Sequence, residues 1–585
     1  MTAPRTRATT PPDPRTDAAP PAPRTDAASP DLQTGAASPG PRIDAASPDL
    51  QTGAASPGPR IDAAPPDLQT GATPPDPQTR ATPPDPRTTT APLDSQTGAA
   101  SPGPRIDAAS PDLQTRATSP GSQTTAAPPH PQTRATPPDP RTTARPVRIT
   151  GPRVACLVTH LGATDVGQHE LLTGEFWAEV ERLGTPLVEE VEDEPGHRAV
   201  TFLWRGDRAT RQVLLLGNRI IDRENLAGSL LEHIPGTDVW HLGLRLRSDH
   251  VGSYRMAADV SAEEPPKDPD ELQQRLRSLS GHAAPDPLNA HVMPTRWHPA
   301  DSSAFALPDS PAQPWAGRHG TVPAGRVERH RVTATALGGD RDVWVYLPPG
   351  HGQGDTSAAA GSGGSAAAGS GGADPLPLLV LCDGDMWFGR LELGHTLDAL
   401  IADGALPPLA VLSPDAVDRH TRWSELGGRH EFVAFLTDEL LPWAAGRWPL
   451  TTDPGRTVVA GQSLGALTAL YAAHLRPDRF GNVLAQSASL WWRPGLPPGV
   501  PKSAVAGIPW VIDLFAEAGP RPLTIHLDVG LHEGLMVDHS RVVYDALRSA
   551  GYRMTFNEYN GGHDYACWHS ALADGLVRLL GPEPR

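Results

Sequence analysis

A short motif in the C-terminal third combines residue types that could carry acyl-transfer chemistry. Residues 461–465 read Gly-Gln-Ser-Leu-Gly, with a short apolar run at 457–460 before them and small apolar residues at 466–474 after them. A strand, a sharp turn and a helix in this order form a nucleophile elbow, in which the glycines permit a strained backbone. Ser463 would stand at a helix N-terminus, where N–H groups and the helix dipole favour negative charge. A chance Gly-x-Ser-x-Gly needs no such flanks, so the pattern predicts Ser463 as a nucleophile.

A serine nucleophile needs a base, and His563 is the candidate. It lies in the run Asn-Gly-Gly-His-Asp at 560–564, where two glycines let the loop fold back so that the imidazole can accept the serine proton and return it to the leaving group. The third member should follow the strand expected at 523–527. Asp528 and Glu533 both lie there; we favour Glu533 because it is deeper in the loop, whereas Asp528 at the strand end could serve a structural purpose. A Ser–His dyad remains open.

Backbone N–H groups should stabilise the oxyanion of such a site. Leu464, directly after the serine, is expected to give one, and Asp385 or its neighbour, in the polar turn after an early strand, is expected to give the other. The alternative for Asp385 is a strand-ending turn with no catalytic duty.

Cationic and aromatic residues follow the same strand ends. Arg419 and Arg422 could pair with an anionic, planar ligand, although Arg422 could equally form a local salt bridge with Glu425. Tryptophans expected on the same surface suit stacking on aromatic acyl groups, and ordinary burial is an equal alternative for each one. They are Trp387, Trp491, Trp492 and Trp568.

The composition argues against several other classes of protein. A net charge of −17 argues against nucleic acid as a partner, because phosphate binding needs a basic surface. Three widely spaced cysteines suggest neither a disulfide framework nor a Cys-x-x-Cys metal site. The N-terminus lacks an apolar signal segment, and no run is long enough to span a bilayer. We therefore expect a soluble, cytoplasmic protein with no membrane partner, and the sequence leaves its oligomeric state open.

The first half of the chain contains regions that differ in composition and in residue pattern. Residues 1–147 repeat a Pro-rich stretch that starts at Arg42, Arg60 and Arg105, and their few large apolar residues predict a disordered tail, or a sequence upstream of the real start. Residues 148–300 hold short strand patterns that predict an all-β, sandwich-like domain. A Pro-rich connection begins near residue 265 and leads into a linker at 301–325.

The remainder, 326–582, alternates strands and helices. Its first two strands, within 327–347, read as a hairpin at a sheet edge, and the Gly/Ser/Ala tract at 350–373 reads as a flexible surface loop. The alternation that follows is typical of crossover helices over a mostly parallel sheet, with function at the C-terminal ends of the strands. The order of parts predicts an α/β-hydrolase domain.

Eight runs of the sequence carry a resemblance to a known family, at 176–177, 286–289, 382–387, 422–426, 458–465, 479–481, 486–492 and 561–568. Together they resemble the enterochelin esterase family, the ferric enterobactin hydrolases, over roughly residues 150–582. The resemblance implies a serine esterase that opens the ester bonds of a cyclic tri-catecholate lactone, so that iron is released in the cytoplasm. It implies no cofactor, since the iron belongs to the siderophore substrate, and an N-terminal domain that helps to enclose the ligand. The repeats at the N-terminus and the insertion at 351–373 depart from the family.

Two other functions fit parts of the sequence. An acyltransferase or feruloyl-type esterase on the same fold would act on sugars or hydroxycinnamates without preferring siderophores. A non-catalytic binding protein would use the β domain and the aromatic rim alone. The presence of both Ser463 and His563 counts against a non-catalytic binding protein.

Overall fold

The computed structural model describes residues 146–351, 374–497, 500, 505 and 507–582, all of which fall in one compact unit, Thr124–Arg585. The predicted disordered tail and the Gly/Ser/Ala tract lie outside the described residues, apart from two positions at the edge of each.

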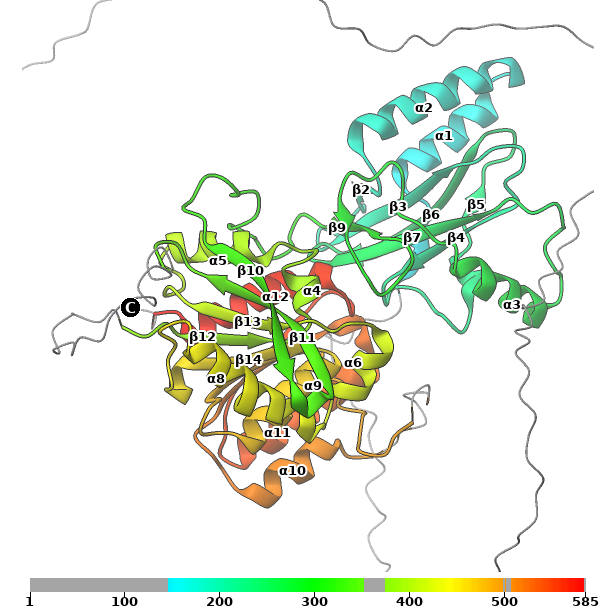
Figure 1. The fold of residues 1–585 in the computed structure, drawn as a ribbon. Coiled ribbons are helices and arrows are strands. Elements are labelled where there is room, and N and C mark those ends of the chain that lie inside the picture. Colours follow the sequence, from blue (N-terminus) through cyan, green and yellow to red (C-terminus); the bar gives the residue numbers. More distant parts are fainter. Residues whose placement is uncertain (1–145, 352–373, 498–499, 501–504, 506, 583–585) are drawn as a thin grey trace, which may run out of the picture. The chain divides into compact units, whose positions relative to one another are not determined.

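The N-terminal part of this unit contains two antiparallel sheets (Figure 1). Apolar side chains from both sheets, among them Phe202, Leu242 and Phe305, are buried together in one core. The predicted antiparallel, sandwich-like domain is confirmed. One sheet contains β1 (Val147–Ile149), β6 (Val239–Arg247), β3 (His197–Arg205), β2 (Leu187–Glu190) and β5 (Glu232–His233), and the other contains β4 (Gln212–Gly217), β7 (Val251–Asp259), β9 (Ser302–Ala306) and β8 (Val292–Met293).

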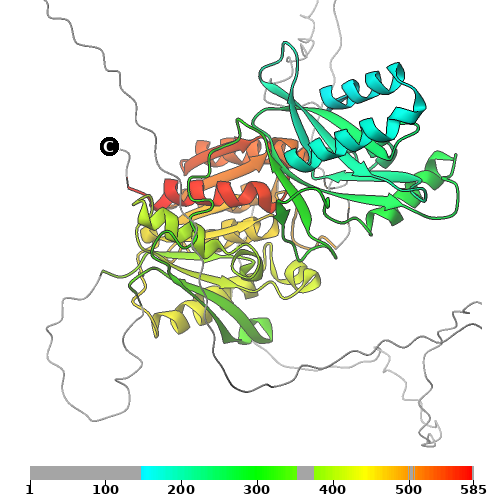
Figure 2. The same ribbon diagram turned by 90° about the horizontal axis from the view of Figure 1, so that it is seen from above.

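Helices complete this part of the chain. Helices α1 (Pro152–Ala163) and α2 (His169–Leu183) lie side by side and pack on the first sheet through an apolar cluster that includes Leu187 and Leu203 (Figures 1 and 2). Helix α3 (Pro269–Ser280) begins inside the expected Pro-rich connection. The sequence favours a helix start there, because Pro269 occupies the first turn and Asp268 accepts hydrogen bonds from two N–H groups of that turn.

The predicted linker at 301–325 is wrong at its start. Strand β9 lies within it and pairs with β7, from Val251 opposite Ala306 to Tyr254 opposite Ser303. The β-rich part therefore extends past the boundary predicted at residue 300. A strand of five residues between prolines is too short to show a clear alternation of apolar and polar residues. Its pairing with β7 identifies it as a strand.

The C-terminal part is built on one eight-stranded sheet with the order β10-β11-β13-β12-β14-β15-β16-β17. The pairs at the β10 end are antiparallel, including the predicted edge hairpin, and the other pairs are parallel. This arrangement confirms the α/β-hydrolase prediction. The strands are β10 (Arg326–Ala334), β11 (Gly339–Leu347), β12 (Leu378–Leu381), β13 (Ala410–Pro414), β14 (Thr457–Gln462), β15 (Asn482–Gln486), β16 (Thr524–Gly530) and β17 (Arg553–Tyr559).

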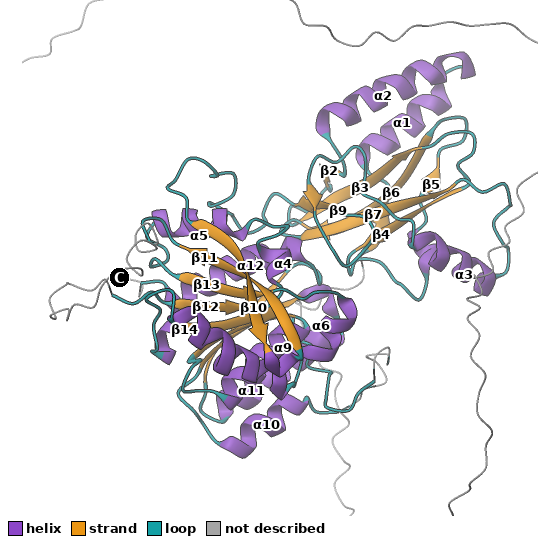
Figure 3. Cartoon of the chain, in the orientation of Figure 1, coloured by secondary structure: helices purple, strands orange, loops and turns teal. Residues whose placement is uncertain are grey.

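Helices cover both faces of this sheet (Figure 3). Every residue of β12 and β14 is consequently buried, which explains the apolar sequence of β12 and the apolar run at 458–460 in β14. One face carries α7 (His430–Ala434), α8 (Leu441–Ala445), α9 (Leu464–Leu475), α10 (Trp510–Ala518) and α11 (Leu535–Ser549), and the other carries α4 (Gly384–Trp387), α5 (Leu393–Ala402) and α12 (Tyr565–Leu580). Helix α6 (Arg419–Glu425) follows β13.

Candidate active site

The structure contains the predicted elbow between β14 and α9. Ser463 has φ 56° and ψ −116°, a conformation that a side-chain-bearing residue adopts only under strain. A Cβ on Gly461 would lie 2.5 Å from the carbonyl carbon of Gly465, and a Cβ on Gly465 would lie 3.0 Å from the Cβ of Cys382. The two glycines therefore let the helix approach the sheet closely enough to hold Ser463 at the turn.

His563 and Glu533 form a close pair. The Nδ1 atom of His563 lies 2.5 Å from Oε2 of Glu533, a residue that is 4% exposed. The other carboxylate oxygen accepts hydrogen bonds from the N–H of Gly530 at 2.8 Å and from the hydroxyl of Ser487 at 2.6 Å. Burial alone would raise the pKa of Glu533, but His563 and these donors outweigh burial and hold it below its ordinary value. Glu533 is thus an ionised group that fixes one nitrogen of the imidazole.

Asp528, the other candidate acid, occupies a different place. Its Oδ1 atom accepts a 2.9 Å hydrogen bond from Asn557 and lies 3.2 Å from Nε2 of His526, and its Oδ2 atom accepts a 3.5 Å hydrogen bond from Gln486. Gln486 and Asn557 belong to the strands on either side of β16. The structure therefore brings Glu533 to His563, and Asp528 instead ties three neighbouring strands together.

Ser463 and His563 line the same cavity, which has a volume of about 420 Å³. The side chains of Leu464 and Trp568 also line it. The hydroxyl of Ser463 lies 3.1 Å from that of Ser489, in the turn after β15. Two residues a hundred positions apart, predicted as nucleophile and base, thus share one pocket of a size that accepts a small molecule.

The two expected oxyanion donors differ in position. Leu464 is the first residue of α9, where N–H groups have no acceptor within the helix. The backbone N–H of Asp385, or of its neighbour, stays a prediction as the second donor. The carboxylate of Asp385 accepts a 2.8 Å hydrogen bond from the N–H of Ala416, pairs with Arg296, and lines a neighbouring cavity. The one-turn helix α4 directs this side chain toward the segment after β13, which the sequence could not show.

Arg419 and Arg422, the two arginines expected to pair with an anionic ligand, both line the cavity. Arg422 donates two hydrogen bonds of 2.7 Å to Asp383, and its guanidinium lies 5.4 Å from the ring centroid of Trp297. The alternative of a local salt bridge between Arg422 and Glu425 is wrong, because Glu425 pairs with Arg341.

Only one of the tryptophans proposed to stack on a ligand lines this cavity. Trp568 packs its ring edge-to-face on His563, with 4.8 Å between the ring centroids. Trp387 is fully buried, and its indole N–H donates a 2.9 Å hydrogen bond to Gln462. Trp491 and Trp492 are buried in the core on the other face of the sheet. For these three, ordinary burial was the correct alternative.

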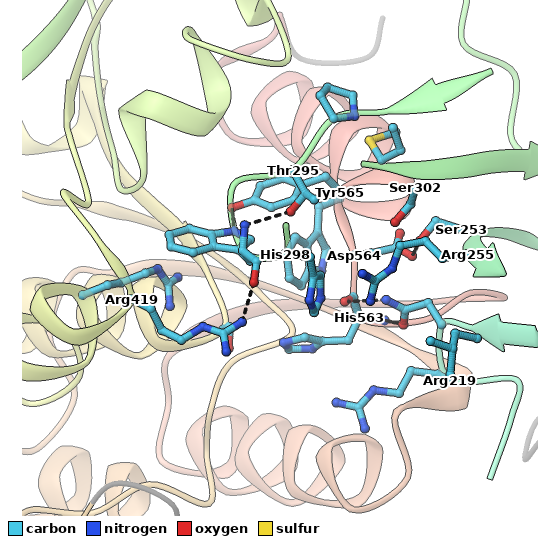
Figure 4. A pocket seen from close by; sticks show the side chains of 18 of the residues that line it. Arg219, Ser253, Arg255, Thr295, His298, Ser302, Arg419, His563, Asp564 and Tyr565 are labelled. Carbon is cyan, nitrogen blue, oxygen red and sulfur yellow. Dashed lines mark hydrogen bonds between the residues drawn. The ribbon is translucent and has the colours of Figure 1, made fainter. Parts of the chain in front are cut away.

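Several cavity residues were missed by the sequence analysis (Figure 4). Trp297 and His298 come from the Pro-rich connection, where a Trp-His pair was the available signal. Arg255 lies on β7, and its signal was a single basic residue within the strand. Arg219 and Arg223 follow β4, and no sequence pattern distinguishes them from surface arginines. In Figure 4, Arg219 and Arg255 enter the cavity from the side opposite Arg419.

The cavity carries a strong positive charge. Five arginines line it, against a single carboxylate, that of Asp564, among the lining residues that the structure describes. Burial, together with the charges of Arg255, Arg419 and Arg223, lowers the pKa of His298 to about 4. Burial raises the pKa of Asp564, and Ser253 donates a 2.6 Å hydrogen bond to it. The cavity is therefore suited to an anion.

Two further observations concern the described residues as a whole. None of their helices combines the length and the apolar character needed to cross a membrane. No three or more histidine, cysteine, aspartate or glutamate side chains within the described ranges are grouped so as to hold a metal ion.

Comparison with known proteins matches both parts of the chain to esterase families. Residues 199–316 match the family described as "Enterochelin esterase, N-terminal", and residues 334–579 match the family described as "Putative esterase". The chain is 34% identical to iron(III) salmochelin esterase of Escherichia coli O6:H1, covering 70% of this chain and 93% of that protein. It is 35% identical to iron(III) enterobactin esterase of Dickeya dadantii, covering 70% and 94% of the two chains.

Solved structures agree with these sequence matches. The crystal structure of ferric enterobactin esterase from Salmonella typhimurium has a TM-score of 0.57 and 29% identity, covering 69% of this chain and 98% of that one. The enterobactin esterase of Shigella flexneri, solved in the presence of enterobactin, has a TM-score of 0.56 and 28% identity, covering 69% and 97%. The chain belongs to the enterochelin esterase family and is a hydrolase that acts on esters.

Proposed function

We propose that this chain hydrolyses the ester bonds of a ferric catecholate siderophore, with Ser463 as nucleophile, His563 as general base and Glu533 as the acid that orients the base. The observation that carries the proposal is the 2.5 Å contact between His563 and Glu533 beside a cavity that Ser463 also lines. With Nδ1 beside the carboxylate, Nε2 is the nitrogen that in this proposal exchanges a proton with the serine.

The reaction follows from these roles. The Ser463 hydroxyl oxygen attacks the ester carbonyl carbon while His563 takes the hydroxyl proton, and the oxyanion is stabilised by the Leu464 N–H at the start of α9. Collapse of the tetrahedral intermediate breaks the ester bond, and the leaving alkoxide receives the proton from His563. Water, activated by the same imidazole, then attacks the acyl-enzyme and releases the acid product and Ser463.

The charge and the aromatic groups of the cavity support the choice of substrate class. Three catecholate dianions around iron(III) leave a net negative charge, which five lining arginines complement. Trp297 and Trp568 offer ring surfaces for the catechols. The named relatives are iron(III) enterobactin and salmochelin esterases, and one solved relative was crystallised in the presence of 2,3-dihydroxy-N-benzoyl-serine, the expected kind of product.

We extend the proposal to domain roles and to compartment. The α/β part from residue 326 supplies the triad, and the β-rich part supplies Arg219, Arg223 and Arg255 as one wall of the cavity. Iron enters as part of the substrate, and the triad chemistry needs no further group. The three cysteines are free thiols, which suits the reducing cytoplasm.

The test is the Ser463→Ala variant with an iron-loaded tri-catecholate lactone, followed by mass spectrometry of the products. We expect hydrolysis to fall by about 10³-fold or more, while binding, measured by quenching of tryptophan fluorescence, is kept. The control is Ser280→Ala, which removes an exposed hydroxyl at the end of α3. Turnover that persists in Ser463→Ala would contradict the assignment. Cleavage of methyl ferulate but not of the lactone by the wild type would favour a feruloyl-type esterase instead.

A further inference from the structure

The loop that carries His563 is bound to the β-rich part of the chain. It joins β17 to α12, at residues 560–564, and it runs beside the first residues of β7. The N–H of Val251 donates a 3.0 Å hydrogen bond to the carbonyl of Asn560, and Val251 forms a parallel bridge with Gly561. Ser253, two residues further along β7, donates to Asp564. The loop is therefore held from outside its own domain on both sides of the histidine.

Asn218 makes the closest connection to His563 itself. Its side-chain Nδ2 donates a 3.1 Å hydrogen bond to the carbonyl of His563, and its Oδ1 accepts a 3.0 Å hydrogen bond from the His563 N–H. Both backbone polar groups of one residue are thus satisfied by one carboxamide. Only asparagine or glutamine offers a donor and an acceptor in this arrangement, because aspartate has no N–H and serine has one short hydroxyl.

The position of Asn218 is itself fixed. It directly follows β4, and its N–H donates a 2.8 Å hydrogen bond to the carbonyl of Ser253 on β7. From the other side, a Cβ on Gly562 would lie 2.7 Å from Oδ1 and 2.9 Å from the carbonyl oxygen of Asn218. The glycine before the histidine therefore leaves the space that the carboxamide needs, and the two residues are matched in shape.

We propose that Asn218 is a positioning residue for the reaction: the β-rich part of the chain sets the backbone of His563, and with it the direction of the imidazole between Ser463 and Glu533. The inference rests on the proposed function of His563. Its consequence is that the β-rich part contributes to turnover of every ester, including esters too small to reach the arginines on its wall. If the β-rich part only lined the cavity, a change in it would alter turnover of the large anionic substrate alone.

The experiment uses the full chain and a small neutral ester, p-nitrophenyl butyrate, beside the ferric tri-catecholate lactone. In Asn218→Ala we expect kcat for both esters to fall about 10- to 100-fold, because a small misplacement of a catalytic group has an effect of this size. The rate at which a fluorophosphonate labels Ser463 should fall in parallel, since labelling also needs the base. The KM for the lactone should change less than about threefold. The matched control is Asn225→Ala, which changes an exposed asparagine in the same loop.

Gly562→Ala disturbs the same contact with Asn218 from the hydrolase side of the chain. It should lower kcat for both esters in the same way, and its effect should not add to that of Asn218→Ala, because both changes break one contact. This variant decides the matter if Asn218→Ala fails to fold. Unchanged kcat and labelling in folded variants would overturn the inference, as would a rise confined to the KM for the lactone. Failure of the proposed substrate is distinguishable, because wild-type protein would then cleave the small ester and leave the lactone intact.

Discussion

Ser487 donates a 2.6 Å hydrogen bond to Oε1 of Glu533, whose other carboxylate oxygen, Oε2, lies 2.5 Å from Nδ1 of His563. Ser487 has φ 49°, and its hydroxyl also accepts a 2.8 Å hydrogen bond from the indole of Trp568. The turn after β15 therefore holds the carboxylate through Ser487, and two residues later Ser489 contacts the hydroxyl of Ser463. One turn touches both ends of the proposed triad.

Ser487→Ala should lower kcat about tenfold, because a hydrogen bond to a charged group contributes about 1.5–3 kcal/mol and its loss frees the carboxylate to rotate. Steady-state kinetics with p-nitrophenyl butyrate would measure the change. The control is Ser424→Ala, which removes a hydroxyl that donates only to the carbonyl of Thr421 on the surface. Equal kcat values in the two variants would show that Glu533 does not depend on this donor.

Glu533→Gln and Asp528→Asn distinguish the two candidate acids. The first should lower kcat about 10²- to 10⁴-fold, because the amide cannot hold the imidazole in the same protonation state. The second should leave kcat within about threefold and lower the melting temperature, since Asp528 connects three strands. The paired kinetic and calorimetric measurements check both statements. A small effect of Glu533→Gln would instead indicate a Ser–His dyad.

The pH dependence of stability should reflect the lowered pKa of Glu533. A carboxyl whose folded pKa lies below its unfolded value stabilises the fold above the unfolded pKa, and this contribution is lost as pH falls through the folded pKa. The free energy of unfolding of the wild type relative to that of Glu533→Gln should fall as the pH is lowered below about 4.5. Denaturant titrations across this range would measure it. A difference that does not vary with pH would contradict the pKa shift.

Arg255→Ala should weaken binding of the iron-loaded, anionic lactone about tenfold, because the guanidinium is largely buried and lines the cavity. Hydrolysis of the neutral p-nitrophenyl ester should be unchanged, and binding of the lactone should become less sensitive to salt. Fluorescence titration at two ionic strengths would measure both effects. Arg277→Ala, which changes an exposed pair with Glu224, is the control. Equal losses in the two variants would point to net charge rather than to a contact in the cavity.

Trp387→Phe should reduce stability and leave substrate affinity unchanged. The change removes the hydrogen bond to Gln462 inside the core, and a buried group left without its partner costs about 1–3 kcal/mol. Thermal unfolding and KM for the lactone would separate the two effects. A raised KM with an unchanged melting temperature would restore Trp387 as a residue that contacts substrate.

The sequence was sufficient where local rules decide the structure. The elbow around Ser463 could be predicted because its glycines recur at a fixed spacing about the serine, and Gly461 is required by its contact with Gly465 four residues later. The alternation of strands and helices gave the parallel sheet, and the order of parts placed His563 after its last strand. These features depend on short stretches of chain and on the fixed direction of crossover connections.

Other parts of the site depend on contacts between distant residues. Trp387 and Trp568 are both buried, and only packing in three dimensions places Trp568, and not Trp387, beside His563 and the cavity. Arg255 and Asn218 reach the site from a different sheet, and no local spacing relates them to Ser463. The choice of Glu533 over Asp528 likewise required the path of the loop after β16.

The three thiols differ sharply in accessibility. Cys382 and Cys567 are 3% exposed, and burial raises the pKa of both, whereas Cys156 on α1 is exposed. A maleimide dye added to the native protein would accordingly attach at one position, without any cysteine having to be removed first. The helix that carries it belongs to the β-rich part, so the natural chain is ready for single-molecule recordings of that part during turnover.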